Sequence, residues 1–236
     1  MIEGLSKAIT LYLSPLLALA AVLLSLFAYL APVIMLQDRV ALLKVVPSTA
    51  LIEAGPDKAV DGPSLFLGVL GSCARTNNAA SIICITPSVN PVYDTSVLPD
   101  GAPDLLLSAP TASTPVFIAV ALSFSILFLI SFTLISFRHK MGGRISSMLD
   151  KPMVQRLSGW LGFLGFVIGL TAFLVVRMWF GKAVQDFNRT IEFQGPRGPK
   201  LLAELGNGFT MVWVAYAFST VPIVISLSKL NVKASK

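Results

Sequence analysis

The sequence predicts an all-α membrane protein, a four-helix bundle with a small extracellular antiparallel β-sheet. Three observations lead to this fold class. The 236-residue chain has a mean hydropathy of +0.78 and only 13% charged residues, about half the charge of a soluble domain. Four of its segments are long and apolar. The stretch between the first two holds strand-forming residues and both cysteines of the chain.

Each of the four apolar segments is long enough to cross a bilayer, because about 20 helical residues span the hydrocarbon core. We expect these spans at about residues 11–36, 115–137, 157–180 and 208–227. Their one ionised residue is Arg177, which is close enough to a span end to reach the interface. The first segment exceeds the usual core of a cleaved signal peptide, so we expect a retained signal-anchor helix.

The distribution of basic residues predicts the orientation in the membrane. Short cytoplasmic loops carry an excess of Lys and Arg. The connector at 138–156 contains one acid, Asp150, and five cations, and the tail after the fourth span carries three lysines. We therefore expect a multi-pass plasma-membrane protein with both termini and this connector in the cytoplasm. Residues 37–114 would form the first extracellular segment and residues 181–207 the second extracellular loop.

Cys73 and Cys84 then fall on the non-cytoplasmic side, where disulfides persist. We expect a stapled hairpin, for which loop entropy gives about 3 kcal/mol of stabilisation; a reactive or regulatory pair is the alternative. Zinc is not expected, because it needs about four ligands and the single histidine, His139, lies in the cytoplasmic connector. Asn77 and Asn78 supply turn residues between the two cysteines.

Strand-forming sequence flanks the hairpin. Apolar runs at 64–70 and 81–85 surround the cysteines, and further strand candidates lie at 39–46 and 49–55. Residues 88–115 are rich in Pro, Ser, Asp and Gly and are typical of an irregular loop that can include one short helix at 103–109. These segments together predict the small sheet.

The motif Gly68-Val69-Leu70-Gly71-Ser72-Cys73, followed by Cys84, resembles the first extracellular segment of claudin-like four-span proteins. Leu70 stands where the family usually has Trp, and this form is similar to the fungal branch of PalI-like proteins and eisosome tetraspanners. The resemblance implies a claudin-like fold and a role in organising the plasma membrane. The family motif then consists of Gly68, Leu70, Gly71, Cys73 and Cys84.

Three further features are candidate sites. Gly162, Gly165 and Gly169 share one face of the third span, either for packing inside the bundle or as a face for another protein. Asn188 begins a glycosylation sequon on the extracellular side, close to the membrane. A basic juxtamembrane cluster can set orientation, contact anionic inner-leaflet lipid, or do both; its members are Arg138, His139, Lys140 and Arg144.

The sequence contains no recognisable catalytic set, phosphate-binding loop or intramembrane carboxylate. We therefore expect no enzyme activity, catalytic residue, metal or cofactor, and no nucleic-acid partner. The expected function is structural: lateral association with itself, with membrane lipids or with a larger membrane protein. The alternatives are an accessory subunit of a membrane enzyme, pump or channel, and, less favoured by the residues, a channel or transporter.

Overall fold

The computed structural model describes residues 9–48, 61–105, 113–195 and 198–234. The chain divides into two compact units. The bundle unit comprises Met1–Leu26, Phe117–Ala172 and Met211–Lys236. The sheet unit comprises Phe27–Val116 and Phe173–Thr210.

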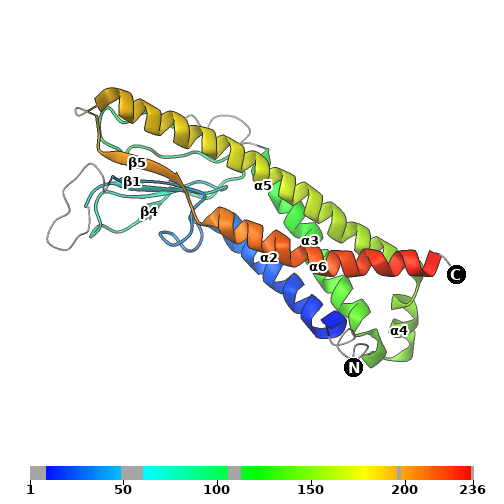
Figure 1. Ribbon diagram of the computed structural model, residues 1–236. Helices are drawn as coiled ribbons and strands as arrows, with labels where there is room; N and C mark the ends of the chain where they lie inside the picture. The colour runs from blue at the N-terminus through cyan, green and yellow to red at the C-terminus, as the bar shows by residue number, and fades with distance from the viewer. Residues whose placement is uncertain (1–8, 49–60, 106–112, 196–197, 235–236) are drawn as a thin grey trace. The chain divides into compact units, whose positions relative to one another are not determined.

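Four long apolar helices confirm the expectation of four spans (Figure 1). They are α2 (Ser14–Leu30), α3 (Thr114–Ser136), α5 (Pro152–Gln194) and α6 (Gly208–Ala234), and a π-helical turn, η1 (Ile9–Leu13), precedes α2. In the most apolar part of each helix, only 28–39% is buried, so most of the side chains there face outward. The chain is therefore a multi-pass membrane protein built on four apolar helices.

Two of the expected span bounds were wrong. The first helix ends at Leu30 rather than near residue 36, because Pro32 follows and has no N–H to continue the helical hydrogen bonds. The third helix, α5, does not end at Phe180 but continues to Gln194. Its 43 residues make a rod of about 64 Å at 1.5 Å per residue. That is about twice the thickness of a hydrocarbon core.

The continuation of α5 replaces the first half of the extracellular loop expected at 181–207. Past the apolar span, Ala183, Phe187 and Ile191 recur at a spacing of four residues, and all three are buried. This spacing places them on one helix face. The second half of the expected loop contains a strand, β5 (Leu201–Leu205), in which Leu201 and Ala203 are buried and alternate with more exposed residues.

The sheet unit contains the expected antiparallel sheet, with five strands in the order β4-β3-β2-β1-β5. The other four strands come from the first extracellular segment: β1 (Leu43–Pro47), β2 (Ser64–Leu67), β3 (Ser72–Arg75) and β4 (Ile83–Cys84). The strand candidate at 49–55 and most of the short helix considered at 103–109 lie outside the described residues.

Pairs of aliphatic residues on neighbouring strands form the core of the sheet. Leu43 lies opposite Leu67, and Val45 lies opposite Leu65 on β2 and Ala203 on β5. All five side chains are at most 1% exposed. Burying one such aliphatic side chain contributes about 1.5–3 kcal/mol, so these pairs determine the register of the three central strands.

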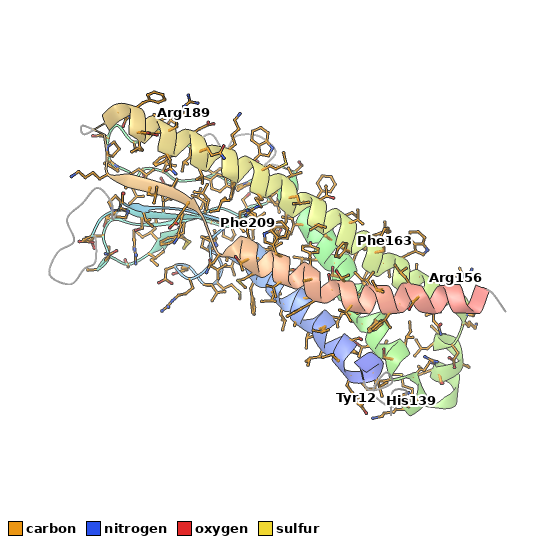
Figure 2. The ribbon with its side chains drawn as sticks, in the orientation of Figure 1. Tyr12, His139, Arg156, Phe163, Arg189 and Phe209 are labelled. Carbon is orange, nitrogen blue, oxygen red and sulfur yellow. A yellow bond between two sulfur atoms is a disulfide. The ribbon has the colours of Figure 1, made fainter. Side chains whose placement is uncertain are left out.

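The connector between α3 and α5 is folded rather than an open loop. It begins with a single 3-10 turn, η2 (Arg138–Lys140), and continues with a seven-residue helix, α4 (Gly143–Leu149). Both elements belong to the bundle unit. His139 and Arg156 lie at this end of the unit (Figure 2).

Candidate functional site

The stapled hairpin of the sheet unit forms as the sequence predicts. Cys73 on β3 lies opposite Cys84 on β4, and the two are joined by a disulfide with an S–S distance of 2.04 Å. Cys73 is 1% exposed and belongs to a buried cluster with Val33 and Phe66. In the intervening turn, the side-chain oxygen of Asn77 accepts hydrogen bonds from the N–H groups of the second and third residues that follow, at 3.0 and 2.7 Å. An amide side chain that closes a turn in this way is a recognised turn former.

Gly68 and Gly71, in the turn before Cys73, have steric roles. The N–H of Gly68 donates to the carbonyl oxygen of Gly71 at 2.9 Å, which closes the turn between β2 and β3. A Cβ on Gly68 would overlap the carbonyl oxygen of Ala31. Gly71 has a φ of 150°, which favours glycine, and a Cβ there would lie 2.9 Å from Cδ1 of Ile85. Leu70 is 5% and Cys73 1% exposed, so the run from Gly68 to Cys73 is buried, while Cys84 is partly buried.

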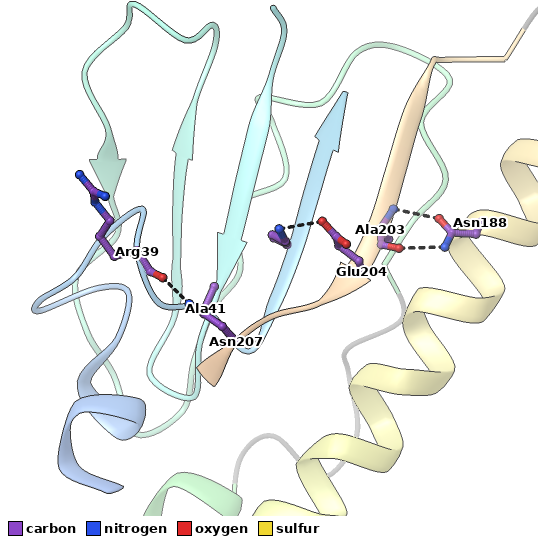
Figure 3. A network of polar contacts seen from close by, with 7 residues as sticks. Arg39, Ala41, Asn188, Ala203, Glu204 and Asn207 are labelled. Atoms are coloured by element: carbon purple, nitrogen blue, oxygen red, sulfur yellow. Dashed lines mark hydrogen bonds and ion pairs between the residues drawn. The ribbon is translucent and has the colours of Figure 1, made fainter. Parts of the chain in front are cut away.

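Asn188 has a structural role that the sequence did not indicate. β5 is an edge strand, and α5 runs beside it (Figure 3). The side-chain amide of Asn188 donates from Nδ2 to the carbonyl oxygen of Ala203 at 2.8 Å, and its Oδ1 accepts from the N–H of Ala203 at 2.9 Å. The side chain of Asn188 thus pairs both the N–H and the carbonyl group of Ala203 on the open edge of the sheet. Because the same amide nitrogen would carry the glycan, this arrangement argues against use of the Asn188 sequon, which its closeness to the membrane already disfavours.

Two other polar contacts of the sheet unit are drawn in the same view (Figure 3). Lys44 on β1 and Glu204 on β5 form an ion pair at 2.7 Å, with both side chains about 40% exposed. Asn207 donates from Nδ2 to the carbonyl oxygen of Arg39 at 2.7 Å. The exposed ion pair contributes about 1 kcal/mol or less, so the hydrogen bonds and the aliphatic pairs carry most of the stability here.

A hollow of about 430 Å³ lies beside β3 and β4 in the sheet unit, and Arg75 and Asp94 are its charged lining residues. The backbone N–H of Asp94 donates to Oγ of Ser72 at 3.0 Å. Hydrogen bonds from Ser96 hold the pKa of the Asp94 carboxyl below its usual value, so this group is a carboxylate at neutral pH. Next to it, burial raises the pKa of the Tyr93 phenol, whose hydroxyl donates to the carbonyl oxygen of Gly68 at 3.1 Å.

The described helices of the bundle unit leave little space between them. They line a cavity of about 30 Å³, with Ser25, Ser125, Tyr216 and Ser219 among its lining residues. A space of this size holds about one water. Ser125 donates to the carbonyl oxygen of Ala121 at 2.9 Å, one turn earlier on its own helix.

The three glycines of the third span pack inside the bundle unit. A Cβ on Gly162 would meet the ring of Phe128 at 2.7 Å, and a Cβ on Gly165 would lie 3.0 Å from Cβ of Phe124. A Cβ on Gly169 would overlap the hydroxyl of Tyr216. These contacts agree with the packing interpretation. They leave no open face at the three glycines for another protein.

The structure divides the basic cluster of the connector. Nε of Arg138 lies 2.6 Å from Oδ1 of Asp150, and Nη1 of Arg138 donates to the carbonyl oxygen of Ile135 at 3.1 Å. Arg138 therefore links the end of α3 to the residue that follows α4. His139 and Lys140 are exposed, and the side chain of Arg144 lies outside the described part of the structure.

Within the residues that the structure describes, no group of three or more His, Cys, Asp or Glu side chains could hold a metal ion. A scan of family models finds no match to the chain, and no curated protein matches it. What the fold and these sites define is a multi-pass membrane protein with a disulfide-stapled sheet unit.

Proposed function

We propose that this protein organises the membrane without enzymatic activity, through lateral association with copies of itself, with lipids or with other membrane proteins. The observation that carries the proposal is the contrast between the interior and the exterior of the bundle unit. The interior holds a cavity of about 30 Å³, which is too small for a substrate. The exterior displays large apolar side chains, among them Leu16, Phe117, Ile130, Trp160 and Val224. The surfaces, not the interior, are therefore available to act.

We also propose the plasma membrane as the location, with both termini and the connector at 138–156 in the cytoplasm. The excess of Lys and Arg in this connector supports that orientation. The disulfide between Cys73 and Cys84 supports a non-cytoplasmic location for the sheet.

Membership of the claudin-like superfamily, in the fungal PalI-like and eisosome branch, is part of the same proposal. Four apolar helices, an antiparallel sheet and a disulfide that closes the motif hairpin support it. The buried packing of Gly68 and Gly71 gives the motif a steric reason in this chain. For a member of this branch we expect a role in organising plasma-membrane domains rather than in sealing the space between cells.

A second candidate function is that of an accessory subunit of a larger membrane enzyme, pump or channel. Exposed apolar side chains on the sheet unit would support it if they form one contiguous patch, because contiguous apolar patches mark partner contacts whereas single scattered ones do not. Ile83 is 74%, Val92 71% and Phe193 78% exposed. A partner that covers them would bury these side chains outside the bilayer.

The proposal is tested by reconstituting the purified protein, as the only protein, into supported bilayers and counting photobleaching steps in each fluorescent spot. An organiser of the proposed kind gives clusters whose size grows with protein density. Single-step, freely diffusing spots at every density would contradict self-association. Co-purification in mild detergent with one larger protein at fixed stoichiometry would favour the accessory subunit. Ion conductance in the same bilayers would refute the proposal.

A further inference from the structure

The connector of the bundle unit carries an unpartnered apolar surface. On α4, Ile145 and Met148 are three residues apart, which places them on one face of the helix, and each is 58% exposed. Met153, in the first turn of α5, is 81% exposed. Apolar side chains gathered on so short a segment are costly to leave in water.

The apolar surface is held in place by contacts within the bundle unit. Leu149, the last residue of α4, is 7% exposed, and Nε2 of the buried Gln155 donates to its carbonyl oxygen at 3.3 Å. The ion pair between Arg138 and Asp150, at 2.6 Å, ties the start of the connector to the end of α4. The helix is therefore anchored along one side while Ile145 and Met148 point outward.

Positive charge surrounds this apolar surface. Lys140, Lys151 and Arg156 are exposed, and no ion pair involving them occurs among the described residues. The one acid of the connector, Asp150, is already paired with Arg138. The segment therefore presents uncompensated cations beside exposed apolar side chains.

We propose that α4 and its flanking residues form an interfacial element that binds the surface of an anionic phospholipid bilayer. Ile145 and Met148 lie at the boundary between headgroups and acyl chains, and Lys140, Lys151 and Arg156 contact the anionic headgroups. Amphipathic helices with basic flanks bind anionic interfaces in this way. The exposed cations are complementary to anionic headgroups, and the spanning helices keep α4 close to a bilayer, which favours a lipid surface over a protein partner. The inference deepens the proposed function, because it identifies the lipid class that would take part in lateral association.

The test measures the depth of α4 in nanodiscs that contain the full-length protein. Single cysteines at Met148→Cys and Gly143→Cys carry a nitroxide, while Cys73 and Cys84 stay oxidised. Gly143 is a matched control on the opposite face of α4, where an added side chain meets nothing within 4 Å. Collisions with oxygen report the lipid phase, and collisions with a water-soluble nickel chelate report water.

In phosphatidylcholine nanodiscs with phosphatidylserine, the label at 148 should favour oxygen and the label at 143 should favour nickel. Phosphatidylcholine alone should shift the label at 148 toward water, and so should high salt, which screens exposed charges. The variant Lys140→Gln/Lys151→Gln/Arg156→Gln should abolish the difference between the two lipids. A charge-matched control on the sheet unit, Arg39→Gln/Lys182→Gln/Lys200→Gln, should leave it unchanged.

The salt titration requires no charge substitution, so it decides the matter even where the triple variant folds poorly. Equal nickel exposure at 148 and 143 in both lipids would overturn the inference, and so would a depth at 148 that ignores both phosphatidylserine and salt. Cluster formation is measured on the same preparations. Clusters with a water-exposed label at 148 would refute the lipid site alone, whereas a buried label without clusters would refute only the self-association of the proposed function.

Discussion

Two substitutions together distinguish the clamp, the pair of hydrogen bonds between the Asn188 side chain and the backbone of Ala203, from the glycosylation sequon that Asn188 begins. In Asn188→Ala, the N–H and the carbonyl group of Ala203 lose partners at 2.9 and 2.8 Å. Ala203 is 1% exposed, so water replaces those partners poorly. Each neutral hydrogen bond contributes about 1 kcal/mol, so the loss is about 2 kcal/mol. Because about 1.4 kcal/mol is a factor of ten, the amides of β5 should exchange hydrogen about 30-fold faster.

The chain offers a matched control for this experiment. Thr190→Ala destroys the sequon but keeps the amide of Asn188, and it removes only a hydrogen bond from the exposed Thr190 to the carbonyl oxygen of Asp186, at 2.8 Å. Hydrogen exchange is followed by mass spectrometry on the peptide that contains residues 201–205. We expect Thr190→Ala to leave the exchange of β5 within a factor of three and Asn188→Ala to accelerate it. Equal exchange in Asn188→Ala and the unaltered protein, or a glycan at Asn188 in the folded protein, would refute the clamp.

Two further experiments test the packing and the disulfide of the sheet unit. Gly68→Ala should lower the free energy of unfolding by about 1–3 kcal/mol, because its Cβ overlaps the carbonyl oxygen of Ala31. Gly181→Ala, where a Cβ meets nothing within 4 Å, should be neutral or stabilising by up to about 1 kcal/mol. Thermal unfolding that ranks the two variants the other way would contradict this geometry. Replacing Cys73 and Cys84 together by Ser should make the protein about 3 kcal/mol less stable than its oxidised form. This loss should equal the loss that reductant causes in the unaltered protein. A double variant as stable as the oxidised protein in urea titrations would show that the disulfide contributes nothing.

Hydropathy and covalent chemistry were readable from the sequence. Four spans follow from apolar length alone, since helices are the simplest way to satisfy backbone hydrogen bonds in lipid. The hairpin could also be predicted, because both cysteines lie in strand-forming sequence around Asn77, whose side chain closes the turn. These features depend on local residues and on the membrane, not on distant contacts.

The second half of α5 and the strand β5 were missed, because average hydropathy falls where the chain leaves the apolar span. Their signals were present in the periodicity: Ala183, Phe187 and Ile191 repeat every four residues, and residues 201–205 alternate in burial. The clamp by Asn188 could not be predicted. It depends on an edge strand that begins thirteen residues later along the chain, and no local pattern marks that pairing.

The connector shows the same limit in the candidate site. Its excess of positive charge was plain in the sequence, but all of its cations were equivalent there. The structure distinguishes Arg138, which is paired with Asp150 at 2.6 Å, from Lys140, Lys151 and Arg156, which remain exposed. The short helix α4 was hidden because its seven residues are too few for a periodic signal.

The sidedness of the stapled sheet and of the connector can be measured in intact cells that carry the protein with a Gly143→Cys reporter. A membrane-impermeant reductant is added outside, followed by an impermeant maleimide, and the modified peptides are identified by mass spectrometry. We predict that Cys73 and Cys84 react only after reduction from outside and that the cysteine at 143 reacts only after permeabilisation. Free thiols at Cys73 and Cys84 that react only from the cytosol, or modification of the cysteine at 143 in intact cells, would contradict the proposed orientation and the extracellular stapled sheet.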